Sequence, residues 1–158
     1  MANNSIKLKN YSDHIEEYVA AGTITPGMLV ERDSDGEVQA HSTAAGNALP
    51  MFALEDSLQG NDIDTDYSAD DPVQVWVPLR GDQVYAILAD GNSVTAGDWL
   101  ESDGNGYLQS HEADSGSSAI LPLAIVAQAL ETLDLSDSSG AESSGALGYN
   151  KRIKVAII

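Results

Sequence analysis

Two stretches of the sequence are versions of each other: ITPGMLVERD at residues 24–33 and VTAGDWLESD at residues 94–103. Thr, Gly, Glu and Asp recur at the same places, and a Gly, a Gln and a His follow each stretch, all at a constant separation of 70 residues. An internal repeat constrains the whole fold, because each copy tends to form the same structural unit. We therefore expect two related halves, residues 24–77 and 94–157.

The repeat continues beyond these stretches with less regularity. LPMFALE at residues 49–55 is matched with LPLAIVA at 121–127, which makes the preceding loop two residues longer in the second half. Each half then has an acidic connection and closes on an alternating strand, VQVWV at 73–77 or RIKVAI at 152–157. The counterpart of the apolar run 84–88 is the weakest match, residues 15–20, which we interpret as a short helix or an ordered loop.

Turn residues and alternation indicate the strands. DSDG at residues 33–36 and DGNG at 103–106 are typical of tight hairpin turns, because glycine adopts positive φ at little cost. We expect Gly36 and Gly106 to lie at these turns. The alternation in residues 73–77 and 152–157 is typical of strands with one buried face. The apolar run 120–133 fits a helix or two strands, and we interpret it as strand.

Length and pattern together predict one domain. With 158 residues and 16.6 kDa, the chain can bury a single core. Short strands with frequent turns are typical of a sandwich or barrel. We expect a mainly β fold, a small β-barrel or sandwich of β-tulip-like form built from two duplicated halves. Residues 1–20 would form an extended amino-terminal arm and residues 21–158 the β domain.

The charge excludes some partners. The chain has 25 acidic and 7 basic residues, a formal net charge of -18, so we expect no binding to nucleic acid or to a membrane surface. The basic residues gather near the two ends, where they either dock on an acidic partner or simply solubilise strands: Lys7, Lys9, Lys151, Arg152 and Lys154. There is no cysteine, which excludes disulfides and thiolate metal sites and leaves the redox compartment undecided. There is also no apolar run long enough for a membrane span and no signal-peptide pattern in residues 1–11, so we expect synthesis in the cytoplasm.

No set of residues indicates catalysis, a cofactor or a metal. His41 and His111 occupy equivalent places in the two halves, which favours a shared structural role over metal ligation. Residues 33–36 lack the later ligands of a calcium loop. Trp76 and Trp99 would suit either a sugar-stacking platform or core packing, and strand positions favour the core. We therefore expect a protein that is not an enzyme.

Several motifs together resemble one family. They are TPGMLVE at residues 25–31, AHSTAAG at 40–46, ALED at 53–56, VWVP at 75–78, GDWLES at 97–102 and GYNKRIKV at 148–155. From about residue 24 to its end, the chain resembles the head-decoration (cement) proteins encoded beside the major capsid gene of tailed bacteriophages. The resemblance implies a structural virion protein on the capsid exterior. It would bind the major capsid protein, stabilise the expanded head, and form a homotrimer at threefold or quasi-threefold positions.

The resemblance also implies a terminal arm that reaches onto the shell. The candidates for this capsid interface are Ile6, Lys7, Leu8, Lys9 and Tyr11. Such an arm, residues 2–11, would be disordered when free and would add a strand to a capsid sheet edge. The alternative for this stretch is an intramolecular first strand. The alternative functions are another head or tail component and a carbohydrate-binding β-sandwich, which would need both tryptophans exposed.

Overall fold

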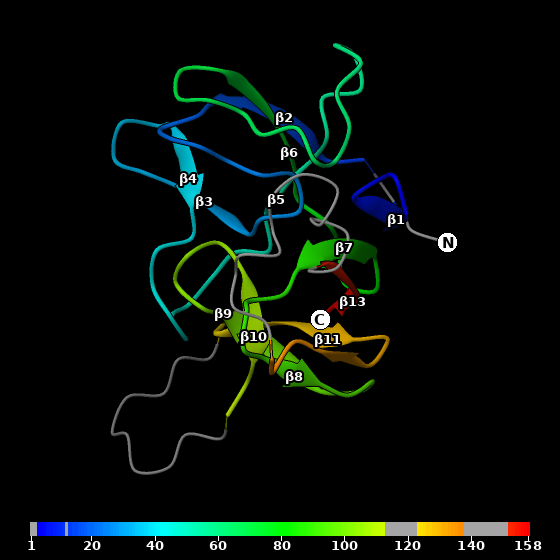
Figure 1. Ribbon diagram of the computed structural model, residues 1–158. Coiled ribbons are helices and arrows are strands. Elements are labelled where there is room, and N and C mark those ends of the chain that lie inside the picture. The colour runs from blue at the N-terminus through cyan, green and yellow to red at the C-terminus, as the bar shows by residue number, and fades with distance from the viewer. Residues whose placement is uncertain (1–2, 12, 113–122, 138–151) are drawn as a thin grey trace.

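The computed structural model describes residues 3–11, 13–112, 123–137 and 152–158, and these residues form strands without helices, as expected (Figure 1). The strands are β1 (Lys7–Lys9), β2 (Ile15–Val19), β3 (Val30–Arg32), β4 (Val38–Ala40), β5 (Phe52–Ala53), β6 (Pro72–Trp76), β7 (Gln83–Ile87), β8 (Ser93–Val94), β9 (Trp99–Ser102), β10 (Leu108–Ser110), β11 (Ile125–Ala129), β12 (Leu133–Asp134) and β13 (Arg152–Ile157). The first half lies above the second in this view. The interpretation of residues 120–133 as strand is confirmed where the structure describes them.

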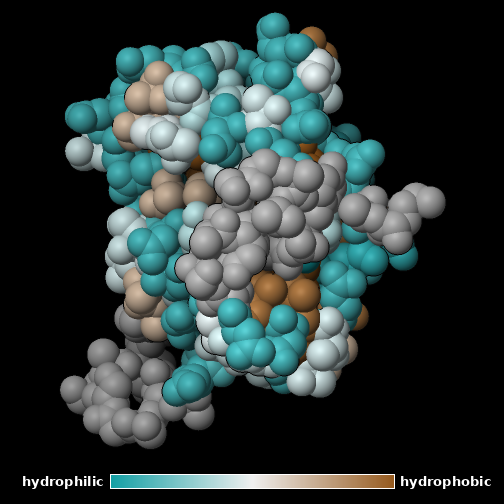
Figure 2. Space-filling model, viewed as in Figure 1, coloured by the Kyte–Doolittle hydropathy of each residue, from teal (hydrophilic) through white to brown (hydrophobic). Residues whose placement is uncertain are grey.

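The strands form several sheets. The largest has the order β1-β7-β13-β11-β9-β10, a second has the order β2-β6-β5, and the pairs β3-β4 and β12-β8 complete the set in the described residues. None of these sheets closes on itself, so the fold is sandwich-like and the barrel alternative is not realised. The face shown in Figure 2 is mostly hydrophilic, in keeping with the acidic composition.

The two halves share one pairing register. Glu31 of β3 pairs with Gln39 of β4, and Glu101 of β9 pairs with Gln109 of β10. Both hairpins are also tied by the same side-chain bond, from the Gln amide to the Glu carboxylate, at 3.2 Å in each case. Residues that correspond in the sequence repeat thus occupy equivalent positions in the two hairpins.

The hairpin turns repeat as well. The Asp33 carboxylate accepts backbone N–H bonds from the residues two and four positions later, both at 2.9 Å. Asp103 accepts the corresponding bonds at 2.8 and 2.9 Å. Gly36 has a φ of 84° and Gly106 a φ of 82°, the region that favours glycine. The prediction that both glycines lie at hairpin turns is confirmed.

The sequence interpretation of residues 15–20 was wrong, because this segment is strand β2. It pairs with β6 along its whole length, as β7 pairs with β13 in the second half. Beyond each strand, an isolated parallel bridge joins Ala20 to Val38 and Leu88 to Leu108. The shared plan of the halves therefore extends back to residues 15 and 83. Its signal was weak because β2 is largely exposed and carries charges on both faces.

One part of the repeat alignment was also wrong. The N–H of Gly27 donates to the Ala53 carbonyl, and the N–H of Gly97 donates to the Ala129 carbonyl, both at 2.8 Å. Ala53 thus corresponds to Ala129, at a separation of 76 residues, whereas the sequence match paired it with Ile125. Two short apolar runs can be aligned at several offsets with similar scores, so only the hydrogen bonds of the folded chain establish which residues correspond.

A buried arginine joins the end of the chain to the first half. The Arg152 side chain is 1% exposed and forms an ion pair with Asp64 at 3.0 Å. Its guanidinium also donates to the carbonyls of Pro26 and Ile63. Lys154 pairs with Glu131 at 3.6 Å on the surface, and Lys151 lies outside the described residues. Arg152 is therefore a structural residue and is not available for docking on a partner.

Candidate functional site: the outer edge of β1

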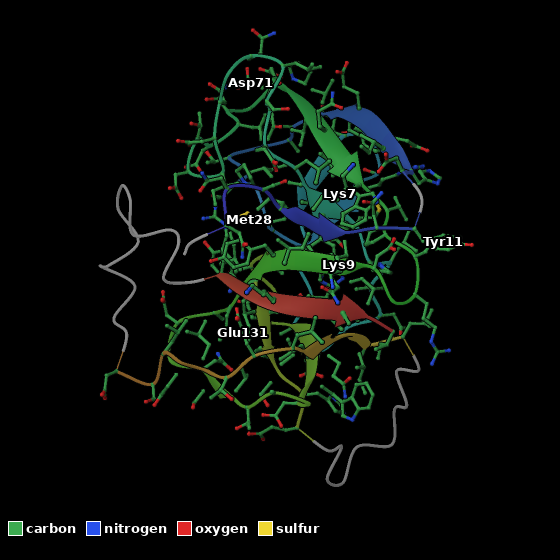
Figure 3. The ribbon with its side chains drawn as sticks, turned by 90° about the vertical axis from the view of Figure 1, so that its right-hand side faces the viewer. Lys7, Lys9, Tyr11, Met28, Asp71 and Glu131 are labelled. Atoms are coloured by element: carbon green, nitrogen blue, oxygen red, sulfur yellow. The ribbon has the colours of Figure 1, made fainter. Side chains whose placement is uncertain are left out.

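The candidate interface residues lie on the outermost strand of the large sheet. β1 pairs with β7 in antiparallel fashion, with Lys7 opposite Val84 and Lys9 opposite Gln83. Just before it, the Ile6 carbonyl accepts the Tyr85 N–H at 2.8 Å. Among the described strands, nothing pairs with the other side of β1, which is an open sheet edge. Figure 3 looks onto this part of the sheet.

The expected disorder of the arm is not found in its described part, residues 3–11. Ile6 is fully buried in the main core cluster, and Leu8 packs against the same cluster. Burial of two aliphatic side chains stabilises the ordered state against the entropy of a free arm. The alternative, an intramolecular first strand, is therefore correct. Alternation of apolar and basic residues in IKLK was the signal for it.

Two carboxylates that the sequence analysis missed hold this segment. Glu55 accepts hydrogen bonds from the Ser5 hydroxyl at 2.6 Å and from the Ile6 N–H at 3.1 Å. At the other end, buried Asp82 accepts the Tyr11 N–H at 2.7 Å. These partners are far apart in the sequence, and nothing distinguishes them from the other acidic residues until the chain is folded.

The folded edge leaves three of the five candidates at the surface. Lys7 is partly exposed and pairs with Asp13 at 2.6 Å, while Lys9 is exposed. Tyr11 is 92% exposed and extends from the body (Figure 3). The structure thus brings two cations and an aromatic ring together along one open edge, and it places Ile6 in the core and Leu8 at its margin.

A hollow lies beside this edge. It has a volume of about 380 Å³ and is lined by Ser5 and Lys7 on the β1 side and by Ile15, Leu54 and Leu58, among others. Ile15 and Leu58 are exposed apolar residues. An open strand edge can pair with a partner strand through backbone hydrogen bonds, while a neighbouring hollow receives one of the partner's side chains. This arrangement suits strand addition.

His41 and His111, the two histidines at equivalent places in the halves, have structural partners. His41 is buried, with Nδ1 2.8 Å from the Ser102 hydroxyl oxygen and Nε2 3.6 Å from a Glu31 carboxylate oxygen. His111 Nδ1 lies 2.5 Å from a carboxylate oxygen of Glu101, which is the counterpart of Glu31. Burial raises the pKa of Glu31, but hydrogen bonds from Ser42 and Gln39 outweigh it and leave this pKa below its usual value. In the described parts of the chain, no group of three or more acidic or histidine side chains is placed to hold a metal ion.

The tryptophans do not form a sugar-stacking platform. Trp76 is fully buried, and only Trp99 is exposed. The carbohydrate-binding alternative required both rings at the surface, so the feature on which it rested is missing.

Comparison with known proteins gives no assignment. No protein-family model matches the chain, and no curated protein matches it at a significant level. Within the described residues there is also no helix of the length and apolar character that crossing a membrane requires.

Proposed function

We propose that the protein is a structural virion protein that binds the exterior of a tailed-phage capsid through the outer edge of β1 and stabilises the expanded head. The observation that carries this proposal is the open edge with Lys7, Lys9 and Tyr11 on a chain of net charge -18. Two lysines on one edge of an acidic body, of which Lys7 is paired with Asp13 within the chain, favour one orientation against an acidic partner. The partner would be the major capsid protein, and the site of action the outside of the virion.

The chemistry required is binding alone. Strand addition supplies backbone hydrogen bonds, the hollow beside β1 supplies side-chain selectivity, and the lysines steer the approach. Binding at many equivalent positions stabilises a shell by mass action, without a catalytic step. The acidic remainder of the surface faces solvent and keeps decorated particles apart. We also infer that the two halves arose by duplication, and that the protein acts as a homotrimer at threefold or quasi-threefold positions.

Another head or tail component remains the alternative, because an open basic edge would serve it equally. Location on the particle separates the two, and electron cryo-microscopy of virions with and without the protein measures it. Density on the capsid exterior supports decoration. Density confined to the tail or the portal region overturns it.

A binding assay tests the edge itself. Deletion of residues 1–11 is unsuitable because it removes buried Ile6, so we choose the double charge reversal Lys7→Glu with Lys9→Glu. The control is Arg80→Glu with Lys154→Glu, which changes the net charge equally at one exposed and one partly exposed position elsewhere. Capsids lacking the protein are pelleted with each variant, and bound protein is measured at several salt concentrations.

The proposal predicts a moderate loss for the edge variant. Measured exposed ion pairs typically contribute about 0.2 to 1 kcal/mol each, so two reversals should weaken binding by roughly two- to thirtyfold while strand pairing remains. Binding of the unmodified chain should weaken as salt rises. Equal binding by edge and control variants would exclude β1 as the interface, and absence of binding to any expanded capsid would exclude the function.

A further inference from the structure

The hairpin turn of the second half contacts the first half, whereas the equivalent turn of the first half makes no corresponding contact among the described residues. The β9–β10 turn, residues 103–106, reaches up to the first half (Figure 1). There the Leu29 N–H donates to the Gly106 carbonyl at 2.8 Å, and the Gly106 N–H donates to the His41 carbonyl at 3.1 Å. We call Leu29 and His41 the first receiving site. By the repeat, its counterpart in the second half, the second receiving site, consists of Trp99 and His111.

The turn fits closely against the first receiving site. A Cβ atom added at Gly106 would lie 2.9 Å from the Ala40 Cβ and 3.2 Å from the Leu29 carbonyl oxygen. Beside this point the Ala45 N–H donates to the carbonyl of Ser102 at 2.9 Å. Leu29 and Ser102 are both fully buried at this contact.

The counterparts of these groups are exposed. Around Gly36, the counterpart of Gly106, nothing lies within 4 Å of an added Cβ. Trp99, the counterpart of Leu29, is 46% exposed, and Arg32, the counterpart of Ser102, has a side chain that is 56% exposed. Among the residues that the structure describes, one hairpin turn therefore has no receiving site, and one receiving site has no turn against it.

A hollow marks the same surface of the first half. It has a volume of about 320 Å³, and its lining includes Val30, Arg32, His41 and Leu49. In the second half, the corresponding space next to Ser102 is where the Ala45 N–H is bonded. By the repeat, the segment containing Ala45 occupies this position beside the second half, while the equivalent position beside the first half is the open hollow. The sequence counterpart of that segment falls in residues 113–122, outside the described residues, and carries no part of the proposal.

We propose that a second copy of this chain completes both surfaces. The β3–β4 turn at Gly36 of one copy docks against Trp99 and His111 of the next, repeating between chains the contact that Gly106 makes within one chain. Such a contact is heterologous, because different surfaces meet, and it produces a ring where the rotation closes and a filament where it does not. The inference rests on the unequal contacts of the two halves and is independent of capsid binding.

Charge sets the conditions for this association. The turn carries Asp33 and Asp35, and the second receiving site lies beside Asp98 and Glu101. Like charges oppose the contact, so backbone bonds and burial of Trp99 must supply the attraction, and salt should strengthen association by screening the repulsion. Binding at the basic β1 edge has the opposite salt dependence, so failure of one proposal is distinguishable from failure of the other.

The test is sedimentation equilibrium of the full chain over a range of concentrations at low and high salt. Gly36→Asn keeps the turn, because asparagine tolerates positive φ and the chain leaves the space open, but it obstructs docking. Its matched control is Gly60→Asn, at a glycine with φ of +80° and equally open surroundings. Trp99→Glu alters the second receiving site, and Leu79→Glu is its control at another apolar residue of nearly the same exposure, 48% against 46%.

We expect the unmodified chain to associate, more strongly at high salt. Gly36→Asn and Trp99→Glu should each weaken association by at least about tenfold, and the controls by less than about twofold. A chain that stays a single copy under all conditions overturns the proposal, as does Gly36→Asn associating like its control.

Mixing the two interface variants tests the direction of the contact. Gly36→Asn retains an intact second receiving site, and Trp99→Glu retains an intact turn. At concentrations where each alone is a single chain, their mixture should form a two-chain species through the one remaining intact contact. Failure to form that species overturns the heterologous contact. Circular dichroism of every variant verifies that each one is folded.

Discussion

The backbone of Gly106 lies between the N–H of Leu29 and the carbonyl of His41, bonded to them at 2.8 and 3.1 Å. The chain thereby joins two hairpins of the same register through a position where no side chain fits. Gly36 has nearly the same φ and no such neighbours. Comparing substitutions at the two glycines therefore distinguishes the cost in stability of the backbone conformation from the cost of a close contact.

Substitution of these glycines should have unequal effects. Gly106→Asn should lower the free energy of unfolding by about 2–4 kcal/mol, because its Cβ is forced against Ala40 and Leu29 in addition to the backbone strain. Gly36→Asn carries only the strain and should cost less than about 1 kcal/mol. Urea denaturation measures both, and equal losses would mean that the two halves separate easily at this point.

Arg152 and Lys154 offer a matched pair on β13. Arg152→Met removes the buried partner of Asp64 and the donor to two carbonyls, so it should destabilise the protein by about 2–5 kcal/mol. Lys154→Met removes an exposed pair with Glu131 and should change stability by less than about 1 kcal/mol. Thermal unfolding distinguishes them, and a mild effect at Arg152 would contradict its structural role.

Residues in β1 should divide by burial. Ile6→Ala should lower stability by about 2–4 kcal/mol, because it leaves a cavity in the main core cluster. Lys9→Ala should leave stability within about 0.5 kcal/mol, since its side chain is exposed. Chemical denaturation of the two variants measures this difference. An unaffected Ile6→Ala variant would revive the free-arm interpretation.

Tyr67 should make stability depend on alkaline pH. Burial raises the pKa of its phenol from 10.0 to about 12, and its hydroxyl donates to the Leu54 carbonyl at 2.8 Å. Because the folded-state pKa is above the unfolded value, this stabilisation is fully present below pH 10 and is lost as the pH rises from 10 to about 12. The loss should approach roughly 3 kcal/mol.

Tyr67→Phe should remove this pH dependence, since phenylalanine does not ionise. The measurements are the free energy of unfolding at several alkaline pH values and the absorbance change of tyrosine ionisation. If both proteins lose stability equally over this range, another group is responsible.

Local pattern predicted much of the fold and little of the candidate site. The turns at Gly36 and Gly106 and the strands β6 and β13 were predictable, because positive φ and period-two alternation are properties of a few neighbouring residues. β2 and the position of β11 were not, because their register depends on strands distant in sequence. Lys7, Lys9 and Tyr11 were identified from the terminal arm that the family resemblance implies, but their arrangement along an open edge depends on the pairing of β1 with β7.

The sequence alone determined the repeated hairpins, the all-β character and an acidic chain with basic ends, since these follow from residue type and spacing. Only the tertiary structure decided that Ile6 belongs to the core and that Arg152 is buried against Asp64. It also decided that, in the described part of the chain, the turn at Gly106 has a receiving site while the turn at Gly36 does not. The physical reason is that burial and close contact are properties of the assembled sheets. Two stretches with the same local preferences acquire different neighbours once the chain packs around one core.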